Sequence, residues 1–231
     1  MVQGGKTVAG AAIGILMLES RFPRIPGDGG NATTWPFPLL FKVVSGATPE
    51  RVVEQGAEGL LDVFIDAGRE LVSAGADGIA TNCGFLALYQ AELSQALSVP
   101  VASSSLLQVN GVQKLLPPGR EVGILTISAA SLTERHLEKA GIPLGAPVGG
   151  IDRGGAFART ILDDRLELDV DAFYRRHNID RTGKATAREI VAHPEERPEE
   201  ARRLKEARYF EARRAQAERD RKKANAQVAI A

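Results

Sequence analysis

Glycine and charge are unevenly distributed along this 231-residue chain, and the break falls near Phe173. Of the 24 glycines, 23 lie in residues 1–173, and only Gly183 follows. Residues 1–173 hold 13 basic and 19 acidic side chains, a balance of −6, whereas residues 174–231 hold 16 and 10, a balance of +6. These are two different kinds of polypeptide. We therefore expect a glycine-rich folded part followed by a charged tail that adds little to its core.

Composition narrows the class of protein. The 29 basic and 29 acidic side chains cancel, so no net charge steers the chain toward nucleic acid or an anionic membrane. A single cysteine, Cys83, excludes an internal disulfide framework and a cysteine-rich zinc site. The apolar run near the start, residues 8–18, is too short to span a bilayer. These features predict a soluble, cytoplasmic protein with no membrane or nucleic-acid partner.

The first part alternates between expected strands and expected helices. Continuous apolar or short β-branched runs predict strands at residues 8–18, 78–82, 99–102 and 121–126. Apolar residues at helical spacing predict helices at residues 45–77, 85–97, 106–116, 131–139 and 156–162. This alternation predicts an α/β fold with open parallel sheets. Ligands of such sheets bind at the carboxyl ends of the strands, where the strand-to-helix turns lie.

Local signals set the expected ends of these helices. Thr48 is suited to cap the helix at residues 45–77, and Gly75 to stop it. Ser131 and Glu134 have the spacing of a capping box for the helix that follows. Within that helix, His136 is expected to be an exposed side chain.

One strand-to-helix turn carries reactive chemistry. Cys83 follows the strand expected at residues 78–82, and backbone donors and the helix dipole at such a turn favour thiolate over thiol. Gly84 permits close approach of a ligand to the backbone, and Thr81 and Asn82 add polar groups suited to a carboxylate. The alternative is a buried structural cysteine, which is a common role for a free cysteine.

The sequences ATNCGFL (80–86), IGILML (13–18), RFPRIPGD (21–28) and GILT (123–126) together resemble the aspartate/glutamate and hydantoin racemase superfamily. The resemblance covers residues 8 to 170. It implies two α/β lobes, a first at residues 1–112 and a second, incomplete one at 113–172, before the charged tail at 173–231. It also implies catalysis without pyridoxal phosphate or another cofactor, by two cysteines that flank the substrate α-carbon.

Cys83 matches the first of those two cysteines, and the sequence has no second one. The resemblance thus implies a racemase- or isomerase-type enzyme for an amino acid or related small carboxylate, with two-base activity in doubt. A homo-oligomer fits this expectation. The alternative is a catalytically silent protein that binds a small carboxylate or another partner. The residues expected to contact substrate are Thr81, Asn82, Gly84, Arg21, Thr126 and Ser128. Residues 19–38, with Arg21 and Arg24, are expected to form a lid over the cleft.

The tail contains a segment, residues 178–189, that resembles an EF-hand loop. The expected oxygen ligands of Ca²⁺ are Asn178, Asp180, Thr182 and Glu189, and Gly183 stands at the turn. With two acidic ligands, any affinity for Ca²⁺ should be weak, and an ordinary polar helix–loop–helix without metal is the alternative. Beyond Pro198, charges four residues apart predict an exposed helix.

Overall fold

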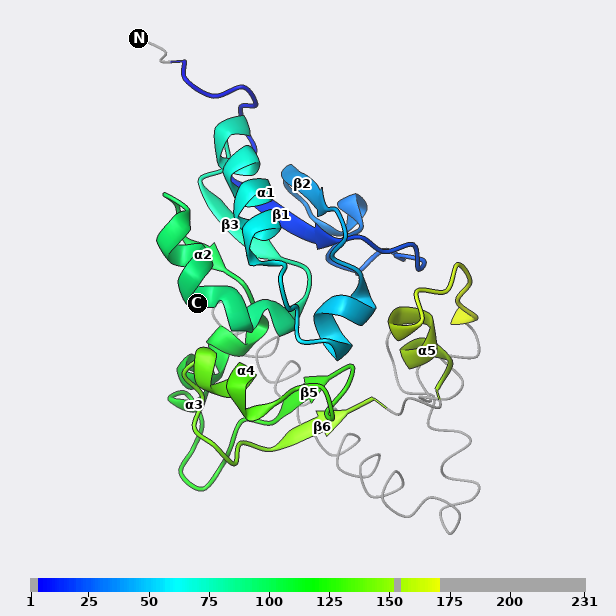
Figure 1. Cartoon of the computed structure of the whole chain (residues 1–231). Coiled ribbons are helices and arrows are strands. Elements are labelled where there is room, and N and C mark those ends of the chain that lie inside the picture. The colour runs from blue at the N-terminus through cyan, green and yellow to red at the C-terminus, as the bar shows by residue number, and fades with distance from the viewer. Residues whose placement is uncertain (1–3, 152–154, 171–231) are drawn as a thin grey trace, which may run out of the picture. The chain divides into compact units, whose positions relative to one another are not determined.

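The computed structural model describes residues 4–151 and 155–170 (Figure 1). The chain divides into two units after Leu168, and the fold and the site described below belong to the first unit. The EF-hand-like loop with Asn178, Asp180, Thr182 and Glu189, and the charged helix after it, lie outside the described residues. Within the described ranges, no helix has the length and apolar character needed to cross a membrane.

Two parallel sheets form the framework, which confirms the α/β class. The first sheet has the order β2–β1–β3–β4, and the second pairs β5 with β6. The strands are β1 (Ile13–Leu18), β2 (Leu39–Val44), β3 (Gly78–Thr81), β4 (Val101–Ala102), β5 (Ile124–Thr126) and β6 (Val148–Gly150). All four strand pairings in the described part of the chain are parallel. The strands β2 and β6 were not expected from the sequence.

The central strand β1 is shorter than the apolar run that contains it. Its last five residues are buried, as expected of a strand covered on both faces. Before it, Gly10 has φ +86° and the Val8 amide donates to the Ala74 carbonyl at 2.9 Å, so residues 8–11 leave the path of the strand. Gly14 is needed for packing, because a Cβ there would lie 3.0 Å from Leu71 Cδ1 in the helix above.

The helix expected at residues 45–77 is two helical segments. A short π-helical turn, η2 (Glu50–Glu54), is followed by a loop in which Gly56, Ala57 and Gly59 all have positive φ. That loop breaks the helical path, and α1 (Leu61–Ala74) begins after it. Gly75 ends α1 with φ +125°, as predicted. The helix α1 packs on β1, β2 and β3 (Figure 1). Its Phe64 and Leu71 side chains are buried.

The two α-helices after β3 and β4 are shorter than expected, and each is preceded by a 3₁₀ turn. The segment expected at residues 85–97 is η3 (Gly84–Tyr89) followed by α2 (Gln90–Ala96), and the one at 106–116 is η4 (Ser105–Gln108) followed by α3 (Val109–Gln113). The helix α5 (Ala156–Leu162) has the predicted bounds. A further 3₁₀ turn, η1 (Ala32–Thr34), lies in the long loop after β1.

The start of α4 (Glu134–Lys139) differs from the prediction. Thr133, not Ser131, is the N-cap, and the capping box is completed by His136, whose Nδ1 accepts from the Thr133 amide at 3.2 Å. The expectation of an exposed His136 is wrong, since the side chain is 2% exposed and its ring contacts the Phe85 ring edge-on at 5.2 Å. The local spacing could not show that η3 packs against this helix.

Candidate functional site

The carboxyl ends of both sheets border one pocket. Parallel pairing of β1 with β3 sets Leu16 opposite Thr81, so Leu18 and Cys83 follow at the same edge of the first sheet. In the second sheet, Thr126 pairs with Gly150 at the ends of β5 and β6. Leu18, Cys83 and Thr126 all line a cavity of about 410 Å³. The cavity therefore lies where an open α/β sheet binds its ligands.

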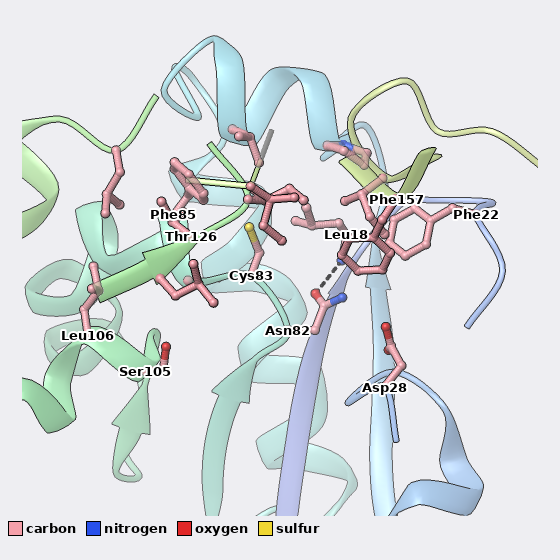
Figure 2. A pocket seen from close by; sticks show the side chains of 18 of the residues that line it. Leu18, Phe22, Asp28, Asn82, Cys83, Phe85, Ser105, Leu106, Thr126 and Phe157 are labelled. Carbon is pink, nitrogen blue, oxygen red and sulfur yellow. Dashed lines mark hydrogen bonds between the residues drawn. The ribbon is translucent and has the colours of Figure 1, made fainter. Parts of the chain in front are cut away.

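The lining is mostly apolar, with a small polar set. Figure 2 shows Phe22, Phe85 and Phe157 around the cavity, and Leu18 and Leu106 add aliphatic surface. The polar side chains that line it are Arg24, Asp28, Asn82, Cys83, Ser105 and Thr126. Apolar walls with a few convergent polar groups are typical of small-molecule sites.

Cys83 lies between β3 and η3, as the sequence predicts, and its sulfur points into the cavity (Figure 2). The residue is buried, with 9% of its surface exposed. Burial raises the pKa of the Cys83 thiol to about 11, while the backbone N–H of Phe85 and the charge of Arg24 act to lower it. The expectation that the turn favours thiolate is therefore wrong, because desolvation outweighs both stabilising contacts.

Asn82 lines the cavity, and hydrogen bonds set the orientation of its side chain. Its backbone N–H donates to Leu16 O at 3.1 Å, which extends the β1–β3 ladder by one residue. Its side-chain Oδ1 accepts from the Leu18 amide at 3.0 Å (Figure 2). Because the oxygen is engaged by a donor, the Nδ2 amino group is the donor that this side chain offers to a ligand.

Thr81 supports the turn and does not line the cavity. Its hydroxyl is within hydrogen-bond distance of two backbone carbonyls as a donor, that of Ser103 at 2.7 Å and that of Cys83 at 3.1 Å. This joins the ends of β3 and β4 and anchors the backbone of Cys83. Gly84 does line the cavity, and a Cβ there would lie 3.4 Å from Ser104 Oγ.

The structure brings Arg24, and not Arg21, to the cavity. The Arg21 side chain is 72% exposed and its Nε donates to Asp164 Oδ2 at 3.3 Å. Arg24 is 17% exposed, pairs with Asp28 at 2.8 Å, and its guanidinium lies 4.4 Å from the centre of the Phe22 ring. Stacking and pairing hold the planar guanidinium in place, which suits it to recognise a carboxylate.

Of Thr126 and Ser128, which were both expected to contact substrate, only the first lines the cavity. Thr126 lines the cavity from the end of β5. Ser128 lies outside it, where its hydroxyl is 2.8 Å from the Ser131 hydroxyl and accepts from the Ser131 amide. Ser128 thus shapes the turn before α4.

Ser105 and Asp28 also line the cavity, and neither was predicted from the sequence. Ser105 begins η4 just after β4, whose Ala102 pairs with Ala80 of β3. The rule that ligands bind at strand ends, applied to the Ser103–Ser104–Ser105 run, would have found it. Asp28 lies in the loop expected at residues 19–38, and no local pattern there indicates which side chains turn inward. Among the described residues, no group of three His, Cys, Asp or Glu side chains is arranged to hold a metal ion.

Comparisons with known proteins give distant enzyme relatives. The chain is 25% identical over 136 residues to a dimethylsulfoniopropionate lyase of Durusdinium sp. clade D, covering 54% of this chain and 42% of the relative. It is 31% identical over 124 residues to dimethylsulfoniopropionate lyase 3 of Emiliania huxleyi, covering 52% and 32%. The chain therefore matches between about a third and two fifths of the length of these relatives. No protein-family model matches it.

Two solved structures have a similar arrangement at low similarity. A glycine-to-cysteine mutant of arylmalonate decarboxylase with sulfate has 22% identity and a TM-score of 0.44, covering 70% of this chain and 72% of that one. An aspartate racemase homologue from Pyrococcus horikoshii has 17% identity and a TM-score of 0.37, covering 66% and 68%.

Proposed function

We propose that this protein is an enzyme that removes the proton from the carbon next to a carboxylate, with Cys83 as the base. The observation that supports this most directly is the thiol pointing into a mostly apolar cavity, with the oriented amide of Asn82 and the guanidinium of Arg24 in the same lining. Donors of this kind would bind the carboxylate and stabilise the charge that develops on it when the proton leaves. The step needs no cofactor.

The raised pKa of Cys83 fits a base for a weak carbon acid. A thiolate whose conjugate acid has a pKa of about 11 holds a proton more strongly than an ordinary cysteine thiolate. The cost is that only a small fraction is ionised near neutral pH. The Phe85 amide and Arg24 both act to lower that cost.

The first candidate reaction is β-elimination, favoured by the names of the curated relatives. In dimethylsulfoniopropionate a sulfonium group stands on the carbon next to the α-carbon. The Cys83 thiolate takes the α-proton, the electrons of the C–H bond form a C=C bond, and the C–S bond breaks. Dimethyl sulfide leaves with the electron pair of that bond, and acrylate remains. A single base completes this reaction, which suits a chain with one cysteine.

The second candidate is proton exchange or racemisation at the α-carbon, favoured by the sequence resemblance. Inversion needs a second acid on the opposite face, and this sequence holds no second cysteine to supply it. One thiol returns a solvent proton to the face from which it took one. We therefore expect exchange to exceed inversion. A protein that binds a small carboxylate without turnover is the remaining alternative.

The test measures both reactions on the purified full chain. Dimethylsulfoniopropionate is supplied and dimethyl sulfide is measured in the headspace. Aspartate, glutamate, hydantoin and arylmalonate are incubated in D₂O, and loss of the α-proton signal is followed by NMR. Release or exchange that disappears in Cys83→Ala supports the proposal.

One control variant and one further test variant are compared with Cys83→Ala. Ser128→Ala changes a hydroxyl outside the cavity and should leave activity unchanged, whereas Thr126→Ala changes one inside it and should reduce activity. Turnover that is the same in Cys83→Ala and in the unaltered protein would refute the role of Cys83. Ligand-induced thermal stabilisation with no turnover of any substrate would favour the binding protein instead.

A further inference from the structure

The Asp164 carboxylate binds the first residues of the loop after β1, which borders the cavity. Asp164 follows α5, and its Oδ1 accepts from the backbone amides of Arg21 at 2.6 Å and Phe22 at 3.1 Å. Its Oδ2 accepts from Arg21 Nε at 3.3 Å. Three hydrogen bonds to one ionised side chain thus join the loop after β1 to the segment after α5. Hydrogen bonds with a charged partner are the stronger kind.

The backbone of Asp164 is in an unfavourable conformation. Its φ is +49°, and among the described residues the other non-glycine residue with positive φ is Ala57. Such a conformation is unfavourable for most residues with a Cβ, although aspartate adopts it more readily than most. The Asp164 side chain is 22% exposed although the residue stands at the surface end of a short helix. The Arg165 amide donates to the Thr160 carbonyl at 3.0 Å, so the left-handed conformation of Asp164 belongs to the end of α5 and turns its carboxylate toward the loop.

The two segments that Asp164 joins, the loop after β1 and the helix α5, both contribute side chains to the cavity wall. Phe22 lines it, and the same ring stacks against the Arg24 guanidinium. On the other side, Phe157 and Ile161 of α5 line the same cavity, and Figure 2 draws both Phe157 and Phe22 in its lining. Asp164 therefore connects two walls that come from opposite ends of the described chain.

We propose that Asp164 is a positioning residue that keeps these two walls together over Cys83 and thereby holds Arg24 in place. It does not itself line the cavity. It acts through the backbone of Phe22, whose ring supports the guanidinium. The proposal rests on the proposed function only in taking the Cys83 cavity as the reaction site.

The neighbouring Asp163 provides a matched control. It is also an aspartate after α5, but its carboxylate pairs locally with Arg165 at 2.8 Å, and it does not line the cavity. Removing either carboxylate changes the net charge by the same amount. A difference between the two variants therefore reports the contact with the loop.

Three substitutions at Asp164 separate the effect of its carboxylate from the effect of its backbone conformation. Asp164→Ala removes the acceptors and keeps the strain, whereas Asp164→Gly removes the acceptors and relieves the strain. Asp164→Asn keeps one neutral acceptor for the two backbone amides. If Asp164→Ala fails to fold, Asp164→Gly still tests the contact, because it lacks the same hydrogen bonds without the backbone penalty.

The experiment measures access to the single cysteine in the full chain. Rates of Cys83 alkylation are determined with iodoacetamide and with a bulky aryl maleimide, from pH 7 to pH 10. For Asp164→Gly we expect the ratio of the maleimide rate to the iodoacetamide rate to rise about tenfold, because opening the walls admits the larger reagent. We expect Asp164→Asn to restore most of the original ratio and Asp163→Ala to match the unaltered protein.

The outcome that overturns the proposal is a ratio and pH profile of Asp164→Gly equal to those of the unaltered protein. An equal rise in Asp163→Ala would overturn it as well, because the effect would then be one of charge. Alkylation needs no turnover, so the result stands even where no substrate reacts. The absence of turnover in the unaltered protein would instead count against the proposed function.

Discussion

The side-chain oxygen of Asn82 lies 3.0 Å from the backbone nitrogen of Leu18 and accepts its hydrogen bond. This contact joins the ends of β3 and β1, two neighbouring strands that are distant in the sequence. It also determines which end of the amide a ligand meets. The residue before the cysteine is therefore both a structural link and an oriented donor.

Replacing this amide with its isosteric acid tests that orientation. In Asn82→Asp, the carboxylate can still accept from Leu18, but it offers no donor and adds a negative charge next to Cys83. We expect the fold to persist, KM for a carboxylate substrate to rise about tenfold or more, and the pKa of Cys83 to rise further. Steady-state kinetics and the pH dependence of alkylation measure the two effects. An unchanged KM would contradict the assignment of Asn82 to substrate binding.

Arg24 should matter for both binding and ionisation. Its charge lowers the pKa of Cys83, so Arg24→Leu should slow alkylation at pH 8 as well as raise KM. Arg24→Lys should rescue the alkylation rate better than KM, because lysine keeps the charge without the planar fork. Arg69→Leu is the control, since Arg69 is 62% exposed and pairs on the surface of α1. Equal effects of the Arg24 and Arg69 variants would remove Arg24 from the site.

The buried thiol should make stability depend on alkaline pH. Burial raises the pKa of Cys83 from 9.0 to about 11, so between these values the unfolded chain releases a proton that the folded chain keeps. The stabilisation is complete below pH 9 and is lost as pH rises toward 11, to a total of about 3 kcal/mol. Urea unfolding from pH 8 to 11 should show a steeper loss in the unaltered protein than in Cys83→Ala. Parallel curves would show that the folded thiol titrates normally.

A side chain at Gly30 should disturb the site although Gly30 does not line the cavity. A Cβ there would collide with Met17 Cε and lie 2.8 Å from Arg24 Nη1. These atoms belong to flexible side chains, so we expect Gly30→Ala to displace Arg24 and raise KM while destabilising the fold by only about 1 kcal/mol. At Gly29 the nearest atom to an added Cβ is Trp35 Cζ2 at 3.9 Å, so Gly29→Ala should be near neutral. Urea denaturation and substrate kinetics on both variants compare them, and equal behaviour would contradict the collision.

Acid should weaken the packing of α4 through His136. Burial lowers the pKa of His136 below its ordinary value of 6.5, and the charge of Arg135 acts in the same direction. The unfolded chain therefore binds a proton first as pH falls below 6.5, and stability decreases toward the lowered folded pKa. His136→Gln keeps a side chain able to complete the capping box and does not titrate. Urea unfolding at pH 7 and pH 5 should show a smaller decrease for this variant, and an equal decrease would assign the acid effect to other groups.

The sequence by itself determined the features that depend on neighbours along the chain. Apolar runs separated by glycine predicted parallel strands, and Gly75 ended α1 where its φ of +125° suits glycine. The position of Cys83 at a strand-to-helix turn followed from the order of residues around it. Such signals are local because the pattern of a strand or a cap is contained in a few consecutive residues.

Only the tertiary structure decided which side chains meet. Arg21 and Arg24 are alike in sequence, yet Asp164 holds the first outside while Phe22 and Asp28 hold the second at the cavity. The strand β2 escaped prediction because Val43 is 56% exposed while Val44 is buried, a pattern set by the elements that cover the sheet. The pKa of Cys83 likewise depends on packing from distant segments. The burial of a side chain and its electrostatic interactions depend on residues far apart in the sequence. No short sequence pattern therefore contains this information.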